Sequence, residues 1–447
     1  MKKGKKIAIA TLGCKVNQFE SAAFSSAFKE KGCELVPFSA RADVYVINTC
    51  SVTGKAGQQS RQLIRRAVRT NPAARLVVTG CYAQMDGARI LEFVDAPLCI
   101  VGNANKHLLV ETALSEETPD LAMLMTSIRQ RPEITHLSVT RFPGRTRAFL
   151  RIQDGCDNFC SYCIVPYTRG RSRSLPRDRV MEQVRVFSRE GYREIVITGI
   201  NVGKYGRDLA EGETIYSLIT LLCETFPAIR FRLSSIEPTE VNDELLAMLQ
   251  GVENFMPHLH IPLQSGDDGI LQRMNRRYTR ADFARVIERI HGALPHCGIG
   301  CDVLCGFPGE DEAAFANTVR LLTALPLSYL HVFPYSKRPG TLAASMRGQV
   351  TGPVRNDRVR RLRELSREKR EAFHRRHLGT VQQVLVERKH RKSGLLQGFS
   401  ENYLEVRIAG PRSLAGTVVP VRIDSFKDGA VIGAPVHSPL EFPEGNR

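Results

Sequence analysis

FLRIQDGCDNFCSYC, residues 149–163, places a C-x3-C-x2-C loop directly after a predicted β-strand, Phe149–Gln153. The three thiols of this loop belong to Cys156, Cys160 and Cys163. Thiolates are the soft ligands that iron–sulfur clusters select. A cubane cluster has four irons and the loop supplies three cysteines, so one iron is left for a ligand outside the protein. Such an open position is typical of catalytic metal sites, because structural sites are closed.

A mononuclear zinc site is the alternative interpretation of this loop. Structural zinc takes four protein ligands, and no fourth Cys or His lies between Asn158 and Gly191. The spacing therefore favours an iron–sulfur cluster with one open iron.

Residues 1–140 predict a doubly wound parallel α/β domain, because short apolar runs alternate with helical patterns. The expected strands are Ile7–Leu12, Val44–Asn48 and Leu76–Thr79, and the expected helices are Phe19–Lys31 and Lys55–Arg69. Cys14, Cys50 and Cys81 each follow one of these strands. Since the carboxyl ends of such strands face the ligand crevice, we expect the three thiols to meet at one edge. The alternative is three buried, inert cysteines.

The rest of the chain predicts two further domains after a polar linker at 116–147. Residues 141–377 hold six βα units, which favours a partial barrel. Residues 378–447 predict a small all-β barrel, because Gly and Pro punctuate short strands. The expected strands are Phe149–Gln153, Ile195–Thr198, Phe231–Ser234, Leu259–Leu263, Cys301–Leu304 and Leu330–Phe333 in the first, and Val381–Glu387, Tyr403–Ile408 and Thr417–Ile423 in the second.

The charge of the chain suggests a polyanionic partner such as nucleic acid, although a merely soluble basic protein fits the charge equally. The formal net charge is +17, and residues 355–392 hold 14 Lys or Arg against 5 Asp or Glu. With Arg169, Arg171 and Arg173, this segment is expected to form a phosphate track, the alternative being a solvated helix face. The 12 cysteines fall in uneven clusters of a large chain, which favours a reducing compartment. The apolar run after Met1–Lys6 is too short for a signal peptide and no run has the length of a membrane span, so we expect a cytoplasmic protein without a membrane contact.

The loop at 156–163 resembles that of the radical S-adenosylmethionine superfamily, which carries C-x3-C-x2-C after the first strand of a partial (β/α)6 barrel. The resemblance implies that the open iron of a 4Fe–4S cluster binds S-adenosylmethionine and that an electron cleaves it to a 5′-deoxyadenosyl radical. It also implies that Tyr162 lies against the adenine, although from sequence alone a packing aromatic fits equally.

The cofactor pocket is expected at the carboxyl ends of the barrel strands, where barrel active sites lie. By resemblance, the methionine part binds at Thr198-Gly199-Ile200-Asn201, and residues 306–310 contact adenine. Each of these residues is equally compatible with a plain strand-end turn. No general base is assigned, because radical hydrogen abstraction needs none. The remaining residues expected in this pocket are Ser235, Glu237, Gln264 and Asp302.

Three N-terminal motifs, residues 11–18, 48–53 and 79–84, resemble those of the methylthiotransferase family, and the segment 154–170 matches its radical loop. The resemblance covers essentially the whole chain and makes the C-terminal barrel a TRAM-like RNA-binding module. It implies a second 4Fe–4S cluster at Cys14, Cys50 and Cys81 that holds the transferred sulfur. It also implies an electron donor such as flavodoxin or ferredoxin.

The text of the motifs selects one branch of that family. Residues 13–18, GCKVNQ, and 331–336, HVFPYS, resemble the branch that modifies threonylcarbamoyladenosine in tRNA, in the anticodon stem-loop. The alternatives are isopentenyladenosine tRNA, a ribosomal-protein aspartate, or a non-catalytic iron–sulfur RNA-binding regulator. The remaining cysteines are interpreted as buried thiols; they are Cys33, Cys99, Cys223, Cys297, Cys301 and Cys305.

Overall fold

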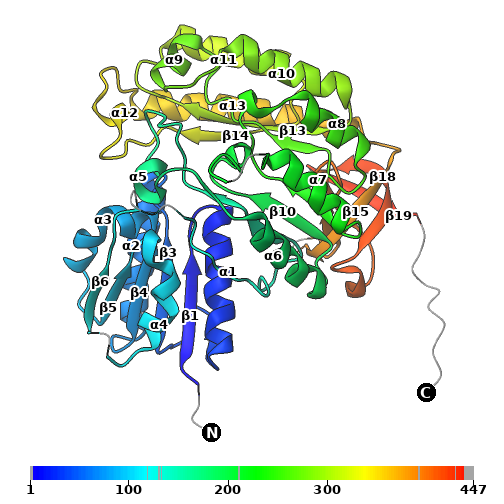
Figure 1. The fold of residues 1–447 in the computed structure, drawn as a ribbon. Helices are drawn as coiled ribbons and strands as arrows, with labels where there is room; N and C mark the ends of the chain where they lie inside the picture. Colours follow the sequence, from blue (N-terminus) through cyan, green and yellow to red (C-terminus); the bar gives the residue numbers. More distant parts are fainter. Residues whose placement is uncertain are drawn as a thin grey trace, which may run out of the picture.

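The structure is a computed structural model that describes residues 4–117, 119–128, 131, 133–209, 212–390, 393–427 and 429–436. Figure 1 shows an N-terminal α/β domain in blue and cyan, a central barrel in green and yellow, and a small C-terminal barrel in orange and red. This architecture confirms the fold class expected from the sequence. In the part of the chain described, no helix is both long and apolar enough to cross a membrane.

The N-terminal domain is a parallel sheet in the order β2-β1-β3-β4-β5-β6. Strand β3 is buried along its whole length, as expected where helices cover both faces of a sheet. The strands are β1 (Lys6–Thr11), β2 (Glu34–Val36), β3 (Val44–Thr49), β4 (Arg75–Gly80), β5 (Leu98–Val101) and β6 (Leu121–Leu124). The helices are α1 (Lys15–Glu30), α2 (Gly54–Thr70), α3 (Cys81–Leu91), the 3-10 helix η1 (Asn103–Leu108) and α4 (Leu109–Leu114).

Strand β6 corrects the expectation of a linker at 116–147. It pairs in parallel with β5 and extends the sheet by one strand. Its side chains alternate, with Leu121 and Met123 exposed, because it lies at the edge of the sheet. The run LAML is apolar but only four residues long, and a short apolar run within a polar segment is a weak signal for a strand.

Helix α1 begins at Lys15, earlier than the expected Phe19. Cys14 is its N-cap residue, and its side chain makes no capping hydrogen bond. The usual Ser, Thr, Asp or Asn signal for a helix start is therefore missing from the sequence. As a consequence, Cys14 lies at the helix N-terminus, directly at the carboxyl edge of the sheet.

The central barrel is built from two three-stranded parallel sheets, β11-β10-β7 and β12-β13-β14. Single parallel bridges between Phe231 and Phe255 and between Ser235 and His260 join them into one curved wall. The strands are β7 (Ala148–Arg151), β10 (Glu194–Thr198), β11 (Arg230–Leu233), β12 (His258–His260), β13 (Gly298–Cys305) and β14 (Tyr329–Pro334), with the short pair β8 (Gln153–Asp154) and β9 (Arg173–Ser174) beside them. The helices are α5 (Val165–Arg169), α6 (Arg177–Arg189), α7 (Ile215–Thr225), α8 (Asp243–Gly251), α9 (Asp268–Arg273), α10 (Arg280–Ala293), α11 (Glu312–Ala324), α12 (Leu342–Ser345) and α13 (Gly352–Arg375).

The C-terminal domain is a closed barrel in the order β15-β16-β17-β19-β18. The sequence pattern misses two of these strands, β16 and β19, since each is short and contains a glycine. Residues 437–447 of the expected domain lie outside the described residues. The strands are β15 (Val381–Lys389), β16 (Leu396–Phe399), β17 (Glu405–Ile408), β18 (Val418–Lys427) and β19 (Ala430–Pro435).

Arg232 joins the two barrels at the amino ends of the central strands. Its guanidinium pairs with the buried Glu194 at 3.0 Å and donates to the carbonyls of Ser400 and Glu401 at 3.1 and 2.8 Å. The ring of Tyr403 packs against the same guanidinium at 4.9 Å. The C-terminal barrel is therefore fixed at the end of the central barrel opposite to its cysteine loop.

Candidate functional site

Cys14, Cys50 and Cys81 come together at the carboxyl edge of the N-terminal sheet, as expected. They follow β1, β3 and β4, which are neighbours in the sheet. A Cβ atom added to Gly13 would lie 2.9 Å from Sγ of Cys50, so the first loop passes directly over the second thiol. Burial, followed by the negative charge of the Cys81 and Cys14 thiolates, raises the pKa of Cys50 to about 11. The thiols are thus close enough to interact, and metal binding would supply the free energy that deprotonates Cys50.

The second cysteine loop lies beyond β8 and has an unusual backbone. Phe159 adopts φ 46°, a left-handed conformation that costs a bulky residue free energy. Asn275 holds it there by donating to the carbonyls of Asn158 and Phe159 at 3.2 and 3.0 Å. The amide of Cys163 donates to the Cys160 carbonyl at 2.9 Å. The loop therefore projects its thiols from a constrained turn.

Arg276 is a candidate site residue that the sequence pattern did not indicate. Its Nη1 donates to Sγ of Cys160 at 3.4 Å, and its Nη2 donates to the Glu237 carboxylate. A cation beside a thiolate stabilises the charged form that binds iron. Arg276 lies 116 residues after Cys160 in the chain, so no local signal could have found it.

Burial also disfavours the thiolate form of two cysteines in the second loop. It raises the pKa of Cys156 to about 11 and that of Cys163 to about 12. Iron–sulfur clusters require deprotonated thiolates as ligands. Metal binding supplies the free energy for this deprotonation. The residues present fit a cluster at each group of three cysteines.

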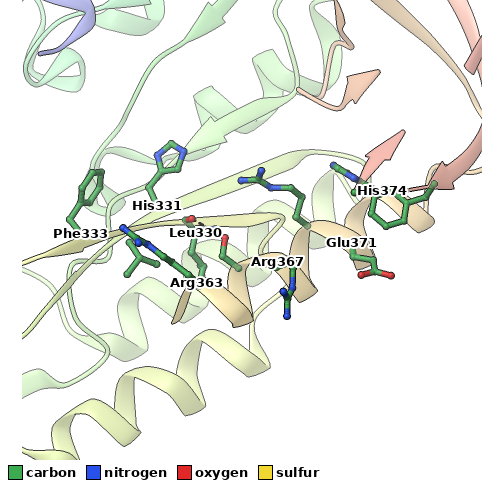
Figure 2. Close-up of a pocket in the computed structure, with 12 residues that line it drawn as sticks. Leu330, His331, Phe333, Arg363, Arg367, Glu371 and His374 are labelled. Atoms are coloured by element: carbon green, nitrogen blue, oxygen red, sulfur yellow. Dashed lines mark hydrogen bonds between the residues drawn. The ribbon is translucent and has the colours of Figure 1, made fainter. Parts of the chain in front are cut away.

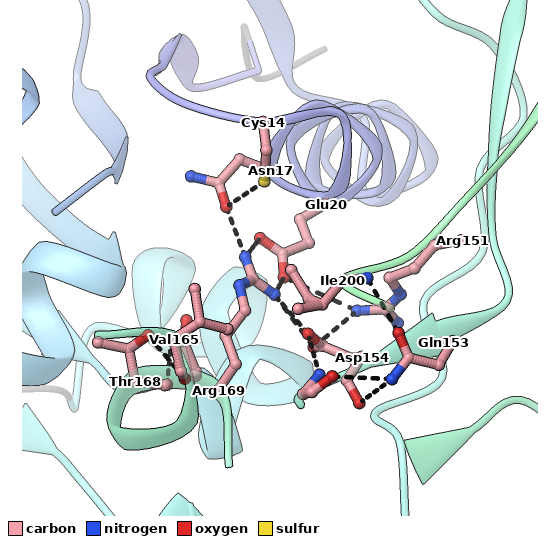
Figure 3. Close-up of polar contacts among 12 residues, drawn as sticks. Cys14, Asn17, Glu20, Arg151, Gln153, Asp154, Val165, Thr168, Arg169 and Ile200 are labelled. Atoms are coloured by element: carbon pink, nitrogen blue, oxygen red, sulfur yellow. Dashed lines mark hydrogen bonds and ion pairs between the residues drawn. The ribbon is translucent and has the colours of Figure 1, made fainter. Parts of the chain in front are cut away.

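A buried ion-pair network centred on Arg169, here called the strut, runs from Asn17 beside Cys14 to Asp154 (Figure 3). Arg169 donates to Glu20 at 3.1 Å, to both carboxylate oxygens of Asp154 at 3.0 Å, and to Oδ1 of Asn17 at 2.5 Å. Asn17 also accepts a long contact of 3.9 Å from Sγ of Cys14. Since Asp154 lies two residues before Cys156, one guanidinium links the two cysteine loops.

The carboxylates of the strut are held in the charged form. Burial alone would raise the pKa of Glu20 and Asp154, but Arg169 and the neighbouring cations hold both pKa values well below the ordinary range. Lys106 donates to Glu20 at 2.5 Å, and Arg151 lies 3.7 Å from it. The strut is therefore an ionised network inside the protein.

This strut corrects part of the expected phosphate track. Arg169 is 1% exposed and Arg173 is 5% exposed, so neither faces solvent. Arg171, whose side chain is 67% exposed and pairs with Asp157, is the member that fits the expectation.

Gln153 links the cysteine loop to the segment after β10. Its Oε1 accepts from the amides of Ile200 and Asn201 at 2.9 and 2.8 Å, and its Nε2 donates to the Gly155 carbonyl at 2.8 Å. A Cβ atom at Gly199 would lie 2.9 Å from that Oε1, which explains the glycine. Nδ2 of Asn201 is buried without a hydrogen-bond partner among the described residues, as expected where a polar ligand completes the site.

The other residues expected in the cofactor pocket fall in three settings. Thr198 is buried and Ser235 is exposed. Gln264, which lies beyond the end of β12, adopts φ 68° and forms an isolated bridge with Val303 of β13. Glu237 pairs with Arg276 beside Cys160, where the structure has a cavity of about 290 Å³. Asp302 lies inside β13 rather than at its end, against expectation.

Tyr162 packs against Phe307, with ring centroids 6.4 Å apart in an edge-to-face arrangement. Phe307 lies in the segment 306–310, which was expected to contact the adenine. The structure therefore brings this segment and Tyr162, both expected near the adenine, into contact. Both rings belong to an apolar cluster with Tyr335. This cluster covers one side of the cysteine loop.

Three other cysteines, Cys297, Cys301 and Cys305, lie on or next to β13 and are at most 2% exposed. Burial raises the pKa of Cys297 and Cys305 to about 12. Inert buried thiols, as predicted, agree with this setting.

Comparisons with known proteins agree with this geometry. The fold is similar to that of TsrM from Kitasatospora setae, a radical S-adenosylmethionine methyltransferase solved with cobalamin and a 4Fe–4S cluster. The TM-score is 0.54, with 13% identity over 76% of this chain and 77% of that chain. Residues 150–322 match the Radical SAM superfamily, and residues 6–102 match Uncharacterized protein family UPF0004. The partial barrel and its cysteine loop thus define a radical S-adenosylmethionine enzyme.

Two relatives show which family of radical S-adenosylmethionine enzymes the chain belongs to. The threonylcarbamoyladenosine tRNA methylthiotransferase MtaB of Bacillus subtilis (strain 168) is 39% identical over 93% of each chain. The protein of the same name from Aquifex aeolicus (strain VF5) is 37% identical over 94% of this chain and all of its own length. The chain belongs to the family of threonylcarbamoyladenosine tRNA methylthiotransferases. Its cofactors are S-adenosylmethionine and two 4Fe–4S clusters.

Gln153→Glu should weaken cofactor binding. The carboxylate still accepts from the amides of Ile200 and Asn201, but it cannot donate to the Gly155 carbonyl. An unsatisfied buried group costs about 1–3 kcal/mol, so Kd for S-adenosylmethionine should rise by roughly tenfold, measured by equilibrium binding to the reconstituted protein. Gln183→Glu is the matched control. Gln183 is a buried glutamine outside the pocket, and its side chain forms hydrogen bonds with the backbone of Val139. Equal affinity in the Gln153 variant and the wild type would contradict the assigned role.

Proposed function

We propose that this protein adds a methylthio group to carbon 2 of N6-threonylcarbamoyladenosine next to the tRNA anticodon. The observation that carries the proposal is the presence of two groups of three cysteines, at Cys14 and at Cys156, linked by the Arg169 strut. Three cysteines at each site would hold one cluster each, and the two clusters would provide separate positions for the cofactor and for the transferred sulfur. The relatives from Bacillus subtilis and Aquifex aeolicus, which are named for this substrate, align over nearly the whole chain.

The chain's own residues hold and orient the reactants. When bound, the cluster at Cys156, Cys160 and Cys163 supplies the electron that cleaves S-adenosylmethionine, and the second cluster carries the sulfur. Such cofactors carry the hard chemistry, while the protein supplies position and electrostatics. Gln153 fixes the backbone beside the cofactor, and the apolar packing of Tyr162 on Phe307 excludes water from that side.

A basic groove beside the barrel supports contact with a short segment of the anticodon stem-loop. It has a volume of about 750 Å³ and lies between β14, α13 and the C-terminal barrel. Arg363, Arg367 and Arg370 lie on its α13 side at helical spacing, so they share one face. Phe333, an exposed aromatic on β14, lies on the other side (Figure 2). Arginines for phosphates and an aromatic for an unstacked base are the groups that single-stranded RNA requires.

Arg367→Ala with Arg370→Ala should reduce tRNA affinity in a salt-dependent manner. Each lost phosphate contact on a single strand changes the slope of log K against log salt by about 0.7, so the double variant should have a slope less negative by about 1.4. Filter binding of the tRNA over a range of salt concentrations measures this slope. Arg285→Ala, at an exposed arginine on α10, is the matched control. An unchanged slope in the double variant would exclude this groove as the RNA site.

The substrate is tested by assaying the anaerobically reconstituted protein on tRNAs that carry either threonylcarbamoyladenosine or isopentenyladenosine. Nucleoside mass spectrometry should detect the methylthio product on the first tRNA only. Product on isopentenyladenosine, or on a ribosomal-protein aspartate instead, would reassign the substrate. Absence of 5′-deoxyadenosine under reducing conditions would favour a non-catalytic regulator.

The partner that delivers the electron is proposed to be a small acidic redox protein such as flavodoxin or ferredoxin. The net charge of +17 favours association with an acidic donor. We place the reaction in the cytoplasm, where tRNA and reduced donors are both present.

A further inference from the structure

Three side chains inside the central barrel form a group that the two cysteine sites do not use. His260 ends β12, Asp302 lies within β13 and His331 lies within β14, so they come from three neighbouring strands. Nε2 of His260 lies 2.8 Å from Oδ1 of Asp302, and Nδ1 of His331 lies 3.6 Å from the same oxygen. In the described part of the chain, their ligand atoms all lie within 4.8 Å of one another.

These distances are close to those of a metal site. A tetrahedral ion bound to nitrogen and oxygen at about 2.0–2.1 Å separates its ligand atoms by about 3.3 Å. The observed separations bracket this value, so small side-chain rotations bring the three donors onto one ion. Two imidazoles and one carboxylate are the donor set of catalytic zinc sites and of non-heme iron sites.

A second layer of contacts orients one of the histidines. Nδ1 of His260, the ring nitrogen that does not face Asp302, lies 3.3 Å from the hydroxyl of Tyr329. The same hydroxyl lies 2.8 Å from Nε2 of His258, which fixes its position. Metal-bound histidines characteristically have such a partner on their other nitrogen, because it sets the tautomer and the ring orientation.

We propose that His260, Asp302 and His331 bind one divalent transition-metal ion, such as zinc, apart from the two iron–sulfur clusters. The site is open on one side: the His331 side chain is 52% exposed, whereas that of His260 is 9% exposed. His331 also lines the basic groove beside Arg363 and Arg367 (Figure 2). With three protein ligands, the ion retains a free position on the groove side, where an oxygen of a bound molecule can coordinate. The metal site itself does not depend on the proposed RNA substrate.

The test counts zinc and iron in the same protein. The full chain, reconstituted anaerobically with both clusters, is dialysed against micromolar Zn²⁺, passed through a desalting column, and analysed by inductively coupled plasma mass spectrometry. About one zinc per chain is expected beside the cluster iron. His331→Ala, which removes a half-exposed side chain, should lower zinc at least tenfold and leave iron unchanged. His107→Ala, at an exposed histidine of the N-terminal domain, should retain the zinc.

X-ray absorption at the zinc edge distinguishes this site from zinc trapped at cysteines. Scattering from nitrogen and oxygen at about 2.0–2.2 Å is expected, and sulfur at about 2.3 Å should be absent. Asp302→Asn serves as a second variant that conserves shape and should also lose the zinc. The proposal is overturned if the wild type binds no zinc, if both variants retain it, or if the spectrum shows sulfur ligands.

Discussion

Cys160→Ala is expected to abolish formation of 5′-deoxyadenosine, whereas Cys14→Ala should retain it and lose only the methylthio product. Cys160 is one of three thiols in the barrel loop and receives the Arg276 guanidinium, so its loss removes both a cluster ligand and its charge partner. Cys14 lies at the other site, at the start of α1. Iron should fall from about eight to about four per chain in each variant, because each cubane carries four. Chromatography of the nucleosides and iron analysis measure the two effects.

Cys223→Ala is the matched control, since Cys223 is a buried cysteine of α7 that belongs to the hydrophobic core. It should retain about eight irons and both products, because a cubane carries four irons. If Cys14→Ala also stopped cofactor cleavage, the division of labour between the two sites would be wrong. If both variants kept eight irons, the assignment of the ligands would be wrong.

The sequence predicts the strands and the cysteines well for a physical reason. Buried parallel strands appear as short continuous apolar runs, and the residue after each run lies at the functional edge. Cys50 follows β3 and Cys81 follows β4 in this manner, so the sheet topology alone brings them together. The missed strand β6 is also an apolar run, but it has only four residues and lies in an otherwise polar segment.

The sequence pattern could not predict contacts between side chains that are far apart in the chain. Arg169 was interpreted as a surface contact for phosphate, since an arginine is usually exposed. Its acceptor Glu20 lies 149 residues away, in a different domain. Nothing in the sequence of α1 indicates that this glutamate is buried. Asp302 lies in the interior of its strand because β13 runs from Gly298 to Cys305, beyond both ends of the expected strand.

Arg169→Met should destabilise the junction between the N-terminal domain and the barrel and should uncouple sulfur transfer from cofactor cleavage. The change leaves Glu20 and Asp154 buried with an incomplete set of cations. Breaking a buried ion pair from one side typically costs about 3–5 kcal/mol in the free energy of unfolding, measured here by chemical denaturation. Since Arg169 links the Cys14 and Cys156 loops, the ratio of methylthio product to 5′-deoxyadenosine should also fall.

The pH dependence of this loss identifies its cause. The pKa values of Glu20 and Asp154 are lowered in the folded protein, so their contribution to stability is present above their ordinary pKa of about 4 and is lost as the pH falls through the lowered values. The difference in stability between Arg169→Met and the wild type should therefore shrink below about pH 4. Arg171→Met is the matched control: its exposed pair with Asp157 is worth at most about 1 kcal/mol. A constant deficit over this pH range would assign the effect to lost packing of the Arg169 side chain rather than to its charge.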